Sequence, residues 1–365
     1  MFEQAPRRPR RLHHLQEPMR ETESPGHVVA LALEGTWRKS PPPLELRPAS
    51  AAAIAPLLLA SGSGALGWWR LRHSEAARLA PVRALRKTYL QSAIQAVEHE
   101  RQVALVFRAF RSSGIEPILI KGWGIARAYA ETGLRPSGDI DLHVAPEQHE
   151  KAREILSTRE CRNYDVDLEH DAISRFSELG FEELSRRSEL AELNGVKIHI
   201  LGAEDHLRLL CLHLLKHGAW RPLWLCDVAA ALESRPTSFD WDRCLGRNKR
   251  WAEWIACTIG LANRLLGAEL GDAPVKKRAG HLPGWLVPAV LKEWSAPYPP
   301  NLPLFTTQLK AGWWKPEIVS AVRQRWPNPI QATVDANGRF DDKIRLPFQI
   351  RHCVARAVKL GLHSR

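Results

Sequence analysis

The sequence is short of the features that mark secreted, membrane-spanning or disulfide-stapled proteins. Its six cysteines in 365 residues include no C-x-x-C pair, and most lie in apolar, helix-like segments. We therefore expect buried, reduced thiols and neither a disulfide framework nor a zinc site. The longest apolar run, residues 51–60, is interrupted by Pro56 and is too short to cross a bilayer. No apolar segment follows the basic N-terminal cluster, so we expect a cytoplasmic protein without a membrane partner.

Basic residues outnumber acidic ones, with 52 Lys and Arg against 40 Asp and Glu and a net charge of +12. Such a balance suits anionic partners, among them nucleotides. The arginines are spread along the chain and no RNA-binding motif is visible, so nucleic acid is a less favoured partner. Residues 1–26, rich in Arg, Pro and Glu, are expected to form a disordered basic tail.

Hydrophobic spacing divides the remaining chain into three regions. Residues 27–112 have apolar positions at mostly helical intervals and are expected to be helical. Residues 113–202 alternate between the two periods, with expected strands at 115–120, 139–144 and 194–201 and expected helices at 123–131 and 146–159. Residues 203–365 are again mainly helical. The pattern predicts an α+β fold, with a small α/β core and flanking helical regions.

The stretch DIDLHV, residues 139–144, places two aspartates close together on one strand. Side chains two residues apart share a face, so Asp139 and Asp141 project together while Ile140 and Leu142 pack behind them. Neighbouring carboxylates repel each other unless a cation lies between them. Their hard oxygens suit Mg²⁺ or Mn²⁺, which takes one or two protein carboxylates and completes its shell with phosphates and water. We therefore expect Asp139 and Asp141 to be catalytic and to bind such a metal.

A phosphate-binding turn is predicted just upstream, where an apolar strand ends in Lys121-Gly122 and a helix begins. Glycine lets the backbone approach a ligand, the helix start offers free N–H groups, and Lys121 adds a point charge. Gly124 belongs to the same turn. Arg135, in the loop GLRPSGD, either reaches a phosphate, orients Asp139, or stabilises the turn. A phosphate cradle beside paired carboxylates is typical of metal-dependent phosphoryl or nucleotidyl transfer.

A second group of residues recurs at helical spacings further along the chain: His213, His217, Trp220, Trp224 and Asp227. The stripe either lines the nucleotide or acceptor side of a cleft or forms a packing seam with hydrogen-bonded histidines. A zinc site on the two histidines is disfavoured, because neither the glutamate of H-E-x-x-H nor a third ligand is present. Lys216, beside His217, is a further candidate for phosphate contact.

These residues carry a resemblance to a known family. The segment IKGWGIARAYAETGLRPSGDIDLHV (120–144) resembles the core of the bacterial nucleotidyltransferase family described as uncharacterised, within the DNA polymerase β-like superfamily. Residues 203–232, with the order His…Lys-His…Trp-Leu…Asp, and residues 325–333 are similar to further segments of that family. The resemblance implies an α/β nucleotidyltransferase lobe beside helical regions, with two Mg²⁺ ions on Asp139 and Asp141. It also implies that Gly122 and its neighbours hold the triphosphate.

The implied reaction moves a nucleoside monophosphate from an NTP, with ATP favoured, to a hydroxyl of an unknown small-molecule, peptide or protein acceptor. The hydroxyl attacks the α-phosphate in line with the departing pyrophosphate. One departure concerns Trp123-Gly124, which replaces a small polar residue of the family pattern and removes an expected hydroxyl contact to phosphate.

A larger departure concerns the third carboxylate, which in the family stands two residues before a histidine on a later strand. Here GVKIHIL puts Lys197 at that place, with His199 as the histidine. A lysine there would compete with the second metal. Three interpretations remain: a one-metal site, a third acid from Asp165, Asp167 or Glu192, or a catalytically impaired nucleotide-binding or scaffold protein. Candidate lining residues of the site are Lys197, His199, His213, Trp224 and Asp227.

Overall fold

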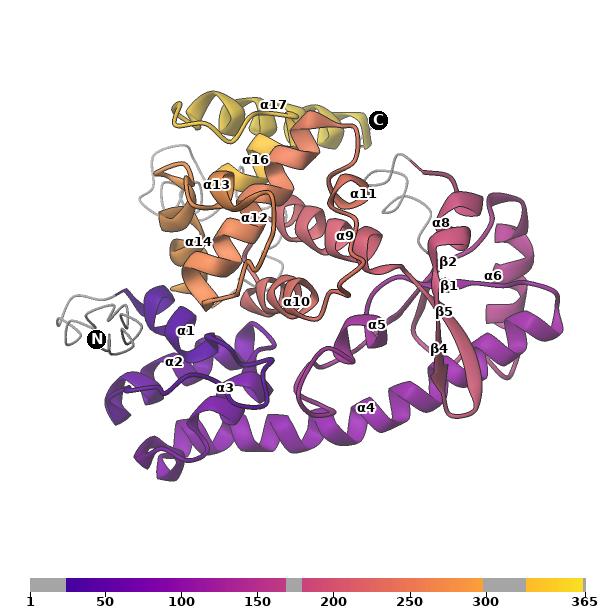
Figure 1. The fold of residues 1–365 in the computed structure, drawn as a ribbon, viewed down its shortest axis with the longest axis horizontal. Coiled ribbons are helices and arrows are strands. Elements are labelled where there is room, and N and C mark those ends of the chain that lie inside the picture. Colours follow the sequence, from indigo (N-terminus) through magenta and orange to yellow (C-terminus); the bar gives the residue numbers. More distant parts are fainter. Residues whose placement is uncertain (1–23, 169–178, 298–325, 364–365) are drawn as a thin grey trace, which may run out of the picture.

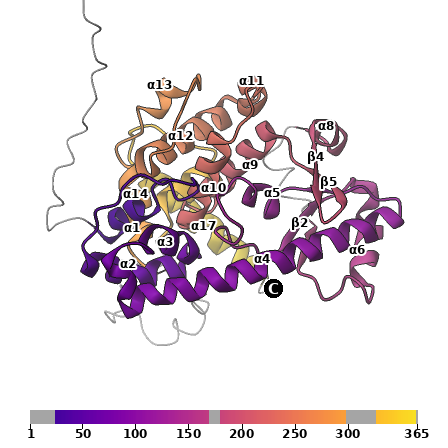
Figure 2. The ribbon, with the colours of Figure 1, turned by 60° about the horizontal axis from the view of Figure 1, so that its bottom comes forward.

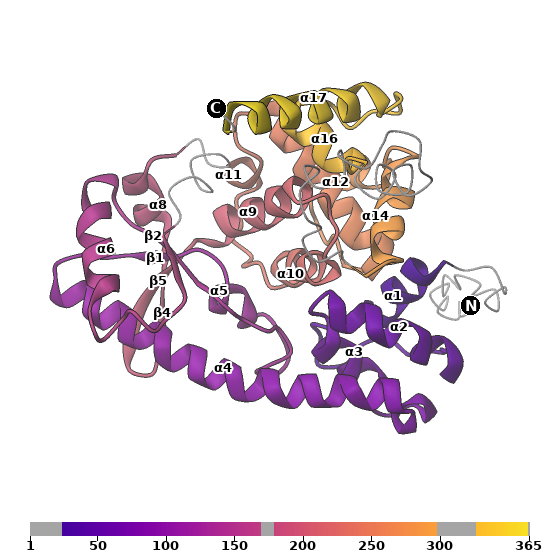
Figure 3. The ribbon, with the colours of Figure 1, turned by 180° about the vertical axis from the view of Figure 1, so that it is seen from behind.

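The computed structural model describes residues 24–168, 179–297 and 326–363, which form a sheet-containing lobe and a larger helical lobe (Figure 1). Most of the tail expected at 1–26 lies outside these residues, and the first described helix begins at Pro25. The long helix α4, Ala80–Ser112, runs beneath both lobes and lies across the front in Figure 2. Seen from behind in Figure 3, the helix α17 (Leu346–His363) covers the side of the helical lobe that faces away from α4.

A five-stranded mixed sheet is the centre of the smaller lobe. Its strands are β1 Ile118–Leu119, β2 Ile140–His143, β3 Val166–Leu168, β4 Glu189–Leu193 and β5 Val196–Ile200. Their order is β3-β2-β1-β5-β4; β1 runs parallel to β5 and β2 parallel to β3, while the other two pairs are antiparallel. The three expected strands are present, and β3 and β4 are additional. The β4–β5 hairpin turns at Asn194 and Gly195, both with positive φ, as a two-residue hairpin loop requires.

The two faces of the sheet differ in character. One face carries Ile140, Leu142 and Ile198 into an apolar cluster with α4 and with α6, His149–Ser157. The opposite face, turned toward the helical lobe, carries Asp141 and Ile120. The period-two alternation of residues 139–144 is therefore the alternation between an apolar layer and a functional face.

The helix α4 joins the cores of both lobes. Near its start Val82 and Leu85 pack into the helical core, and near its end Phe107 and Phe110 pack beneath the sheet. In between, Ile94 is 73% exposed, so the apolar face expected along the helix is not continuously covered by the described residues. The expected boundary at residue 112 coincides with the end of α4, but the division into domains stays a prediction.

The helical lobe is built from the remaining helices. They are α1 Pro25–Leu33, α2 Pro48–Ala60, α3 Gly64–Leu71, η1 Glu75–Arg78, α9 Ala203–Lys216, α10 Pro222–Glu233, α11 Trp241–Leu245, α12 Lys249–Leu266, α13 Lys276–Ala279, α14 Leu286–Trp294 and α16 Pro329–Asp335. Three short elements belong to the sheet side: α5 Trp123–Ala126, η2 Pro146–Gln148 and α8 Phe181–Arg187. In the described part of the chain, none of these helices combines the length and apolarity needed to cross a membrane.

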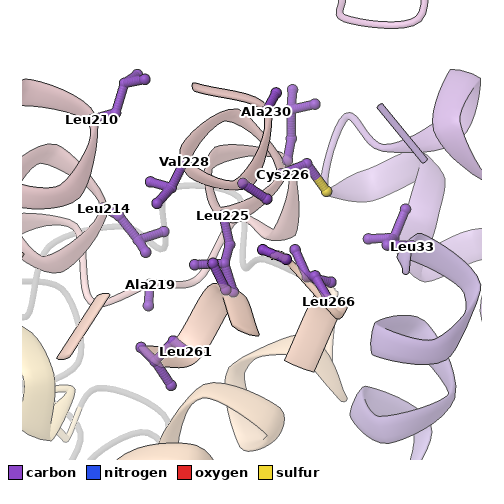
Figure 4. Packing of buried hydrophobic residues seen from close by; sticks show 14 of the residues in the cluster. Leu33, Leu210, Leu214, Ala219, Leu225, Cys226, Val228, Ala230, Leu261 and Leu266 are labelled. Atoms are coloured by element: carbon purple, nitrogen blue, oxygen red, sulfur yellow. The ribbon is translucent and has the colours of Figure 1, made fainter. Parts of the chain in front are cut away.

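The core of the helical lobe lies where α1, α9, α10 and α12 meet. Figure 4 shows Leu33, Leu214, Leu225 and Leu266 converging there from these four helices. All six cysteines are free thiols, and every one except Cys353 is buried, as the sequence predicts. Burial raises the pKa of the Cys257 thiol to about 12, so this group stays protonated and unreactive at neutral pH.

Candidate functional site

The turn after β1 places Lys121 and Gly122 beside the aspartate strand. Gly122 has φ +61° and ψ −117°, a backbone conformation that residues with a Cβ rarely adopt, so glycine is needed at this position. The helix that follows, α5, was expected to reach residue 131 but ends at Ala126 after one turn. A single turn has little macrodipole, so the helix start contributes less to phosphate binding than the sequence suggested. Gly124 lies within α5, against the buried ring of His206.

The two aspartates of the D-x-D stretch differ in their environments. Asp139 is exposed, whereas Asp141 is only 4% exposed. The Lys121 ammonium lies 2.7 Å from Oδ1 of Asp141. Burying a carboxylate is costly unless a cation accompanies it, so this ion pair explains how Asp141 remains inside the protein. The cation that the paired aspartates require is, in the free protein, supplied by the lysine of the neighbouring turn.

A third carboxylate lies next to Asp141 on the adjoining strand. Asp167 of β3 is in register with Asp141 of β2, and these strands are parallel. Residues in register on neighbouring strands lie about 4.8 Å apart and share a face, so Asp167 belongs to the face of the two aspartates. The side chain of Asp167 is exposed. Of the three acids that the sequence left open, Asp165 and Asp167 lie beside the aspartate strand, since the Asp165 carbonyl accepts from the Ile140 N–H, whereas Glu192 is on β4 at the other edge of the sheet. Of these two, Asp167 is in register with the buried Asp141.

Lys197 does not stand where the third acid was expected, which corrects the sequence analysis. β5 is parallel to β1 and pairs Ile200 with Leu119, so the end of β5 beyond Ile200 lies beside the Lys121 turn. Lys197 lies roughly 13 Å along the strand from the level of Asp141. It is exposed and in register with Glu192 of β4. Lys197 therefore cannot pair with the aspartates or block a metal there.

His199 is likewise engaged away from the aspartates. Its Nδ1 lies 2.7 Å from the hydroxyl of Ser188, and its Nε2 lies 3.9 Å from Glu116, which precedes β1. Ser188 immediately precedes β4 and Glu116 lies just before β1, so both contacts of His199 are made outside the aspartate strand. His199 is in register with Ile118 of β1, and β5 stands two places from β2 in the sheet, so a lining role for His199 stays a prediction.

The donor set around β2 fits a magnesium-type ion that takes part of its shell from a substrate. Asp141 and Asp167 are in register on neighbouring strands near one edge of the sheet, and Asp139 immediately precedes β2. Within residues 24–168, 179–297 and 326–363, no three His, Cys, Asp or Glu side chains come close enough together to form a complete metal cage. Mg²⁺ is usually bound by only one or two carboxylates together with phosphates and water, so a full cage is not needed.

Arg135 is bound to Asp227, not to Asp139. Its Nη2 donates to Oδ2 of Asp227 at 3.1 Å and its Nε to Oδ1 at 3.3 Å, a bidentate pair in which Asp227 is fully buried. The Tyr129 hydroxyl donates to Oδ1 of Asp227 at 2.7 Å. Burial and the charge of Asp227 raise the pKa of Tyr129 well above its ordinary value, so the hydroxyl remains a donor. Asp227 is therefore an anchor for the loop before β2 and does not line the site.

The stripe of histidines and tryptophans comes from two helices, which corrects the expectation of one. α9 ends at Lys216, the chain turns through Gly218 and Ala219 with positive φ, and α10 begins at Pro222. The rings nevertheless meet in one group, the ring cluster, which consists of His213, His217, Trp220 and Trp224. The ring centres of His213 and Trp224 are 4.6 Å apart, with the two rings nearly perpendicular.

The charge of Lys121 acts on the ring cluster. Burial and, next, this charge hold the pKa of His213 well below its ordinary value. Arg221 extends the cluster, with its guanidinium 5.5 Å from the centre of the Trp224 ring. Lys216 lines a separate cavity of about 310 Å³ with Trp251 and Asn337 of the helical lobe. The structure thus gathers His213, His217 and Trp224 into one cluster and places Lys216 at a different cavity.

His99 of α4 is a site residue that the sequence analysis missed. It is 5% exposed, its Nε2 has no hydrogen-bond partner among the described residues, and a methyl group added at Gly122 would lie 3.7 Å from that nitrogen. Burial and the charge of Arg135 lower its pKa, while Asp139 opposes them. His99 also lines a cavity of about 320 Å³ with Glu100 and Ser137. No local signal marks it, because it is one of many polar residues in a 33-residue helix.

Comparison with known proteins agrees with this geometry. Residues 49–267, more than half of the chain, match the model of the family described as uncharacterised nucleotidyltransferase, and the chain belongs to that family. The matched range includes the five-stranded sheet, the Lys121 turn, and the helices α9 and α10 that carry the ring cluster. Neither the curated proteins nor the solved structures contain a match to this chain.

Proposed function

We propose that this protein transfers a nucleoside monophosphate from an NTP to an acceptor hydroxyl, with release of pyrophosphate, and that the reaction depends on Mg²⁺ or Mn²⁺. The observation that carries the proposal is the buried carboxylate of Asp141, held against a cation 2.7 Å away. Asp139 lies two residues before it, immediately ahead of β2, and Asp167 is in register on the next strand. Acids gathered at one sheet edge beside a glycine turn suit nucleotidyl transfer.

Each side chain at the edge of the sheet has a separate task in this proposal. One or two of the carboxylates of Asp139, Asp141 and Asp167 would hold the divalent ion, which when bound would neutralise charge on the α-phosphate. Gly122 permits the tight turn that keeps the backbone close to the phosphates. Arg135 fixes the loop before β2 through Asp227 and so holds Asp139 and Asp141 in place. The acceptor oxygen forms the new bond to the α-phosphorus as the bond to pyrophosphate breaks, and its proton passes to a carboxylate or to water.

The nucleotide is assigned to the boundary between the sheet and the ring cluster. Lys121 supplies a cation for the triphosphate, and His213, His217 and Trp224 supply rings beside it. A flat base or a sugar packs favourably against such rings. ATP is the first donor to test. The acceptor belongs to the class of hydroxyl-bearing small molecules, peptides or proteins, and nucleic acid stays the less favoured acceptor because the excess positive charge is spread over the chain.

The test is release of pyrophosphate from ATP in the presence of Mg²⁺ and a broad acceptor panel. The double substitution Asp139→Ala/Asp141→Ala should abolish metal-stimulated release while far-ultraviolet circular dichroism shows a folded chain. Asp242→Asn, which changes an exposed aspartate of α11, is the matched control and should behave as the wild type. Equal release by the double variant and the wild type would disprove the proposed role of the two aspartates.

The alternative to a transferase is a nucleotide-binding or scaffold protein without catalytic activity. Lys197 favours it only if this lysine takes the place of the third carboxylate and competes with a metal. That support is lost, because Lys197 lies away from the aspartates and Asp167 lies beside Asp141. The same assay separates the two functions. Binding of Mg²⁺ and ATP without pyrophosphate release, for every acceptor in the panel, would favour the binding protein.

A further inference from the structure

The ion pair of Lys121 and Asp141 is buried on both sides. The side chains are 14% and 5% exposed, and Nζ lies 2.7 Å from Oδ1. A carboxylate at this depth requires a positive partner whether or not a metal is bound. In the free protein the lysine is such a partner, and Asp141 is in register with Asp167 of the adjoining strand.

The chemistry of the two basic residues near β2 differs in one important respect. Arg135 donates two hydrogen bonds to Asp227 in a planar, bidentate arrangement that fixes its position. Lys121 has a compact ammonium on a flexible four-carbon stem, and its donors can turn toward another acceptor. Of these two cations, Lys121 is the one suited to exchange partners.

A second acceptor for Lys121 would lie on the side facing the helical lobe. His213 of α9 is close enough for the charge of Lys121 to lower its pKa. The ammonium is in contact with the buried carboxylate at 2.7 Å, and its charge also acts on the ring cluster, to which the proposed function assigns the nucleotide. From this position the side chain can swing toward a triphosphate without any change in the backbone of the turn.

We propose that Lys121 is an internal counter-ion that couples metal binding to nucleotide binding: it neutralises Asp141 in the free protein and transfers to the triphosphate when a divalent ion takes its place. This inference rests on the proposed function. A divalent ion and an ammonium on the same carboxylate repel each other, so Lys121 must leave Asp141 for metal to bind. The released ammonium has lost its carboxylate, and a triphosphate restores a negative partner to it.

The sign of the coupling follows from this exchange. A metal ion alone must displace Lys121 from Asp141 and therefore binds weakly. When a triphosphate binds as well, the metal neutralises Asp141 and the triphosphate neutralises the Lys121 ammonium. Each ligand should strengthen the binding of the other by the same factor, because coupling between two binding sites is reciprocal. Without the ammonium, metal alone should bind more tightly, the triphosphate more weakly, and the coupling should largely disappear.

The experiment measures Mn²⁺ binding by electron paramagnetic resonance, with and without a non-hydrolysable ATP analogue, at pH 8, well above the ordinary pKa of a carboxyl group. The variants are Lys121→Met, which removes the charge, and Lys121→Gln, which keeps a donor for Asp141 and preserves a folded chain if the first variant does not fold. The matched control is Lys197→Met, an exposed lysine of the same sheet. Circular dichroism checks the fold of each variant.

We expect Lys121→Met or Lys121→Gln to tighten the binding of Mn²⁺ alone by about tenfold, within the usual range of coupling between sites. The analogue should strengthen Mn²⁺ binding in the wild type and in Lys197→Met, but hardly at all in the Lys121 variants. Unchanged or weaker binding of Mn²⁺ alone in both Lys121 variants, or no Mn²⁺ binding by any chain, would overturn the inference.

Failure of the inference and failure of the proposed function give different results, because this measurement involves no turnover. If the Lys121 variants bind Mn²⁺ more tightly but the protein releases no pyrophosphate with any acceptor, the role of Lys121 as counter-ion is supported and the proposed transferase activity is contradicted. Pyrophosphate release by the wild type, with Mn²⁺ binding unaffected by Lys121, would support the transferase and contradict the counter-ion.

Discussion

Arg135 and Asp227 form a buried, bidentate ion pair that joins the loop before β2 to the helix α10. Nη2 and Nε of Arg135 lie 3.1 and 3.3 Å from the two carboxylate oxygens of Asp227, which is completely buried. One partner belongs to the segment that positions Asp139 and Asp141, and the other belongs to the helical lobe. The pair therefore ties the geometry of the aspartate face to the packing of the two lobes.

Removing the charge of Asp227 should destabilise the protein strongly. In Asp227→Asn the guanidinium of Arg135 would remain buried without a countercharge, and such losses cost about 3–5 kcal/mol. Urea denaturation followed by circular dichroism measures the change in the free energy of unfolding. The matched control is Asp272→Asn, which removes the countercharge of Arg235 from an 88% exposed site, where solvent screens the pair, and should lower the free energy of unfolding much less. Equal losses in the two variants would contradict the importance assigned to the buried pair.

Stability should fall on acidification because of His206. Burial lowers the pKa of His206 to about 4 against the opposing charge of Asp227, with Arg135 and Arg127 adding to the lowering. The unfolded chain therefore binds a proton near pH 6.5, whereas the folded chain takes it up only near pH 4. As the pH falls from about 6.5 to 4, the free energy of unfolding decreases by up to about 3 kcal/mol.

The contribution of His206 can be isolated by substitution. We expect His206→Gln to flatten the dependence of the unfolding free energy on pH between about 6.5 and 4, measured by urea denaturation at a series of pH values. The control His281→Gln, which changes an exposed histidine, should show the same dependence of the unfolding free energy on pH as the wild type. A wild-type slope in His206→Gln would show that other groups dominate the acid sensitivity.

Substitutions at Asp167 and Lys197 should reveal which position supplies the third acid. Asp167→Asn should lower metal-dependent pyrophosphate release at least about tenfold, comparable to the loss of one charge-stabilising contact, with little change in stability because the side chain is exposed. Lys197→Glu, which restores the acid of the family pattern, should not raise activity. It should instead lower the free energy of unfolding by about 0.2–1 kcal/mol, because the new carboxylate would lie directly opposite Glu192 of β4 and the like charges repel. Higher activity in Lys197→Glu would reverse the assignment.

Gly122→Ala should weaken the turn through backbone strain and not through a steric clash. The added methyl group would lie 3.7 Å from the Asp139 carbonyl oxygen, an ordinary contact, but φ +61° with ψ −117° is unfavourable for alanine by about 1–3 kcal/mol. Thermal unfolding and the KM for ATP report the two effects. Gly138→Ala, in open space in the same loop without a positive φ, should change neither.

The local part of the fold was within reach of the sequence. The alternation of residues 139–144 predicted a strand with both aspartates on one face, and β2 has its apolar residues in the core and Asp141 on the opposite face. The Lys-Gly pair predicted a turn after an apolar strand, and Gly122 occupies it with positive φ. Such features depend on neighbouring residues and on the geometry of a strand or a turn, which the sequence specifies directly.

What the sequence determined by itself was therefore the family, the strand that carries the aspartates and the turn beside it. The tertiary structure decided the partners: Lys121 for Asp141, Asp227 for Arg135, Asp167 beside the aspartates and Lys197 away from them. These pairings depend on strand order and strand direction and on the contact between lobes, which bring together residues up to 92 positions apart. No periodicity within a short segment encodes such contacts, because they arise only when the separate elements pack against one another.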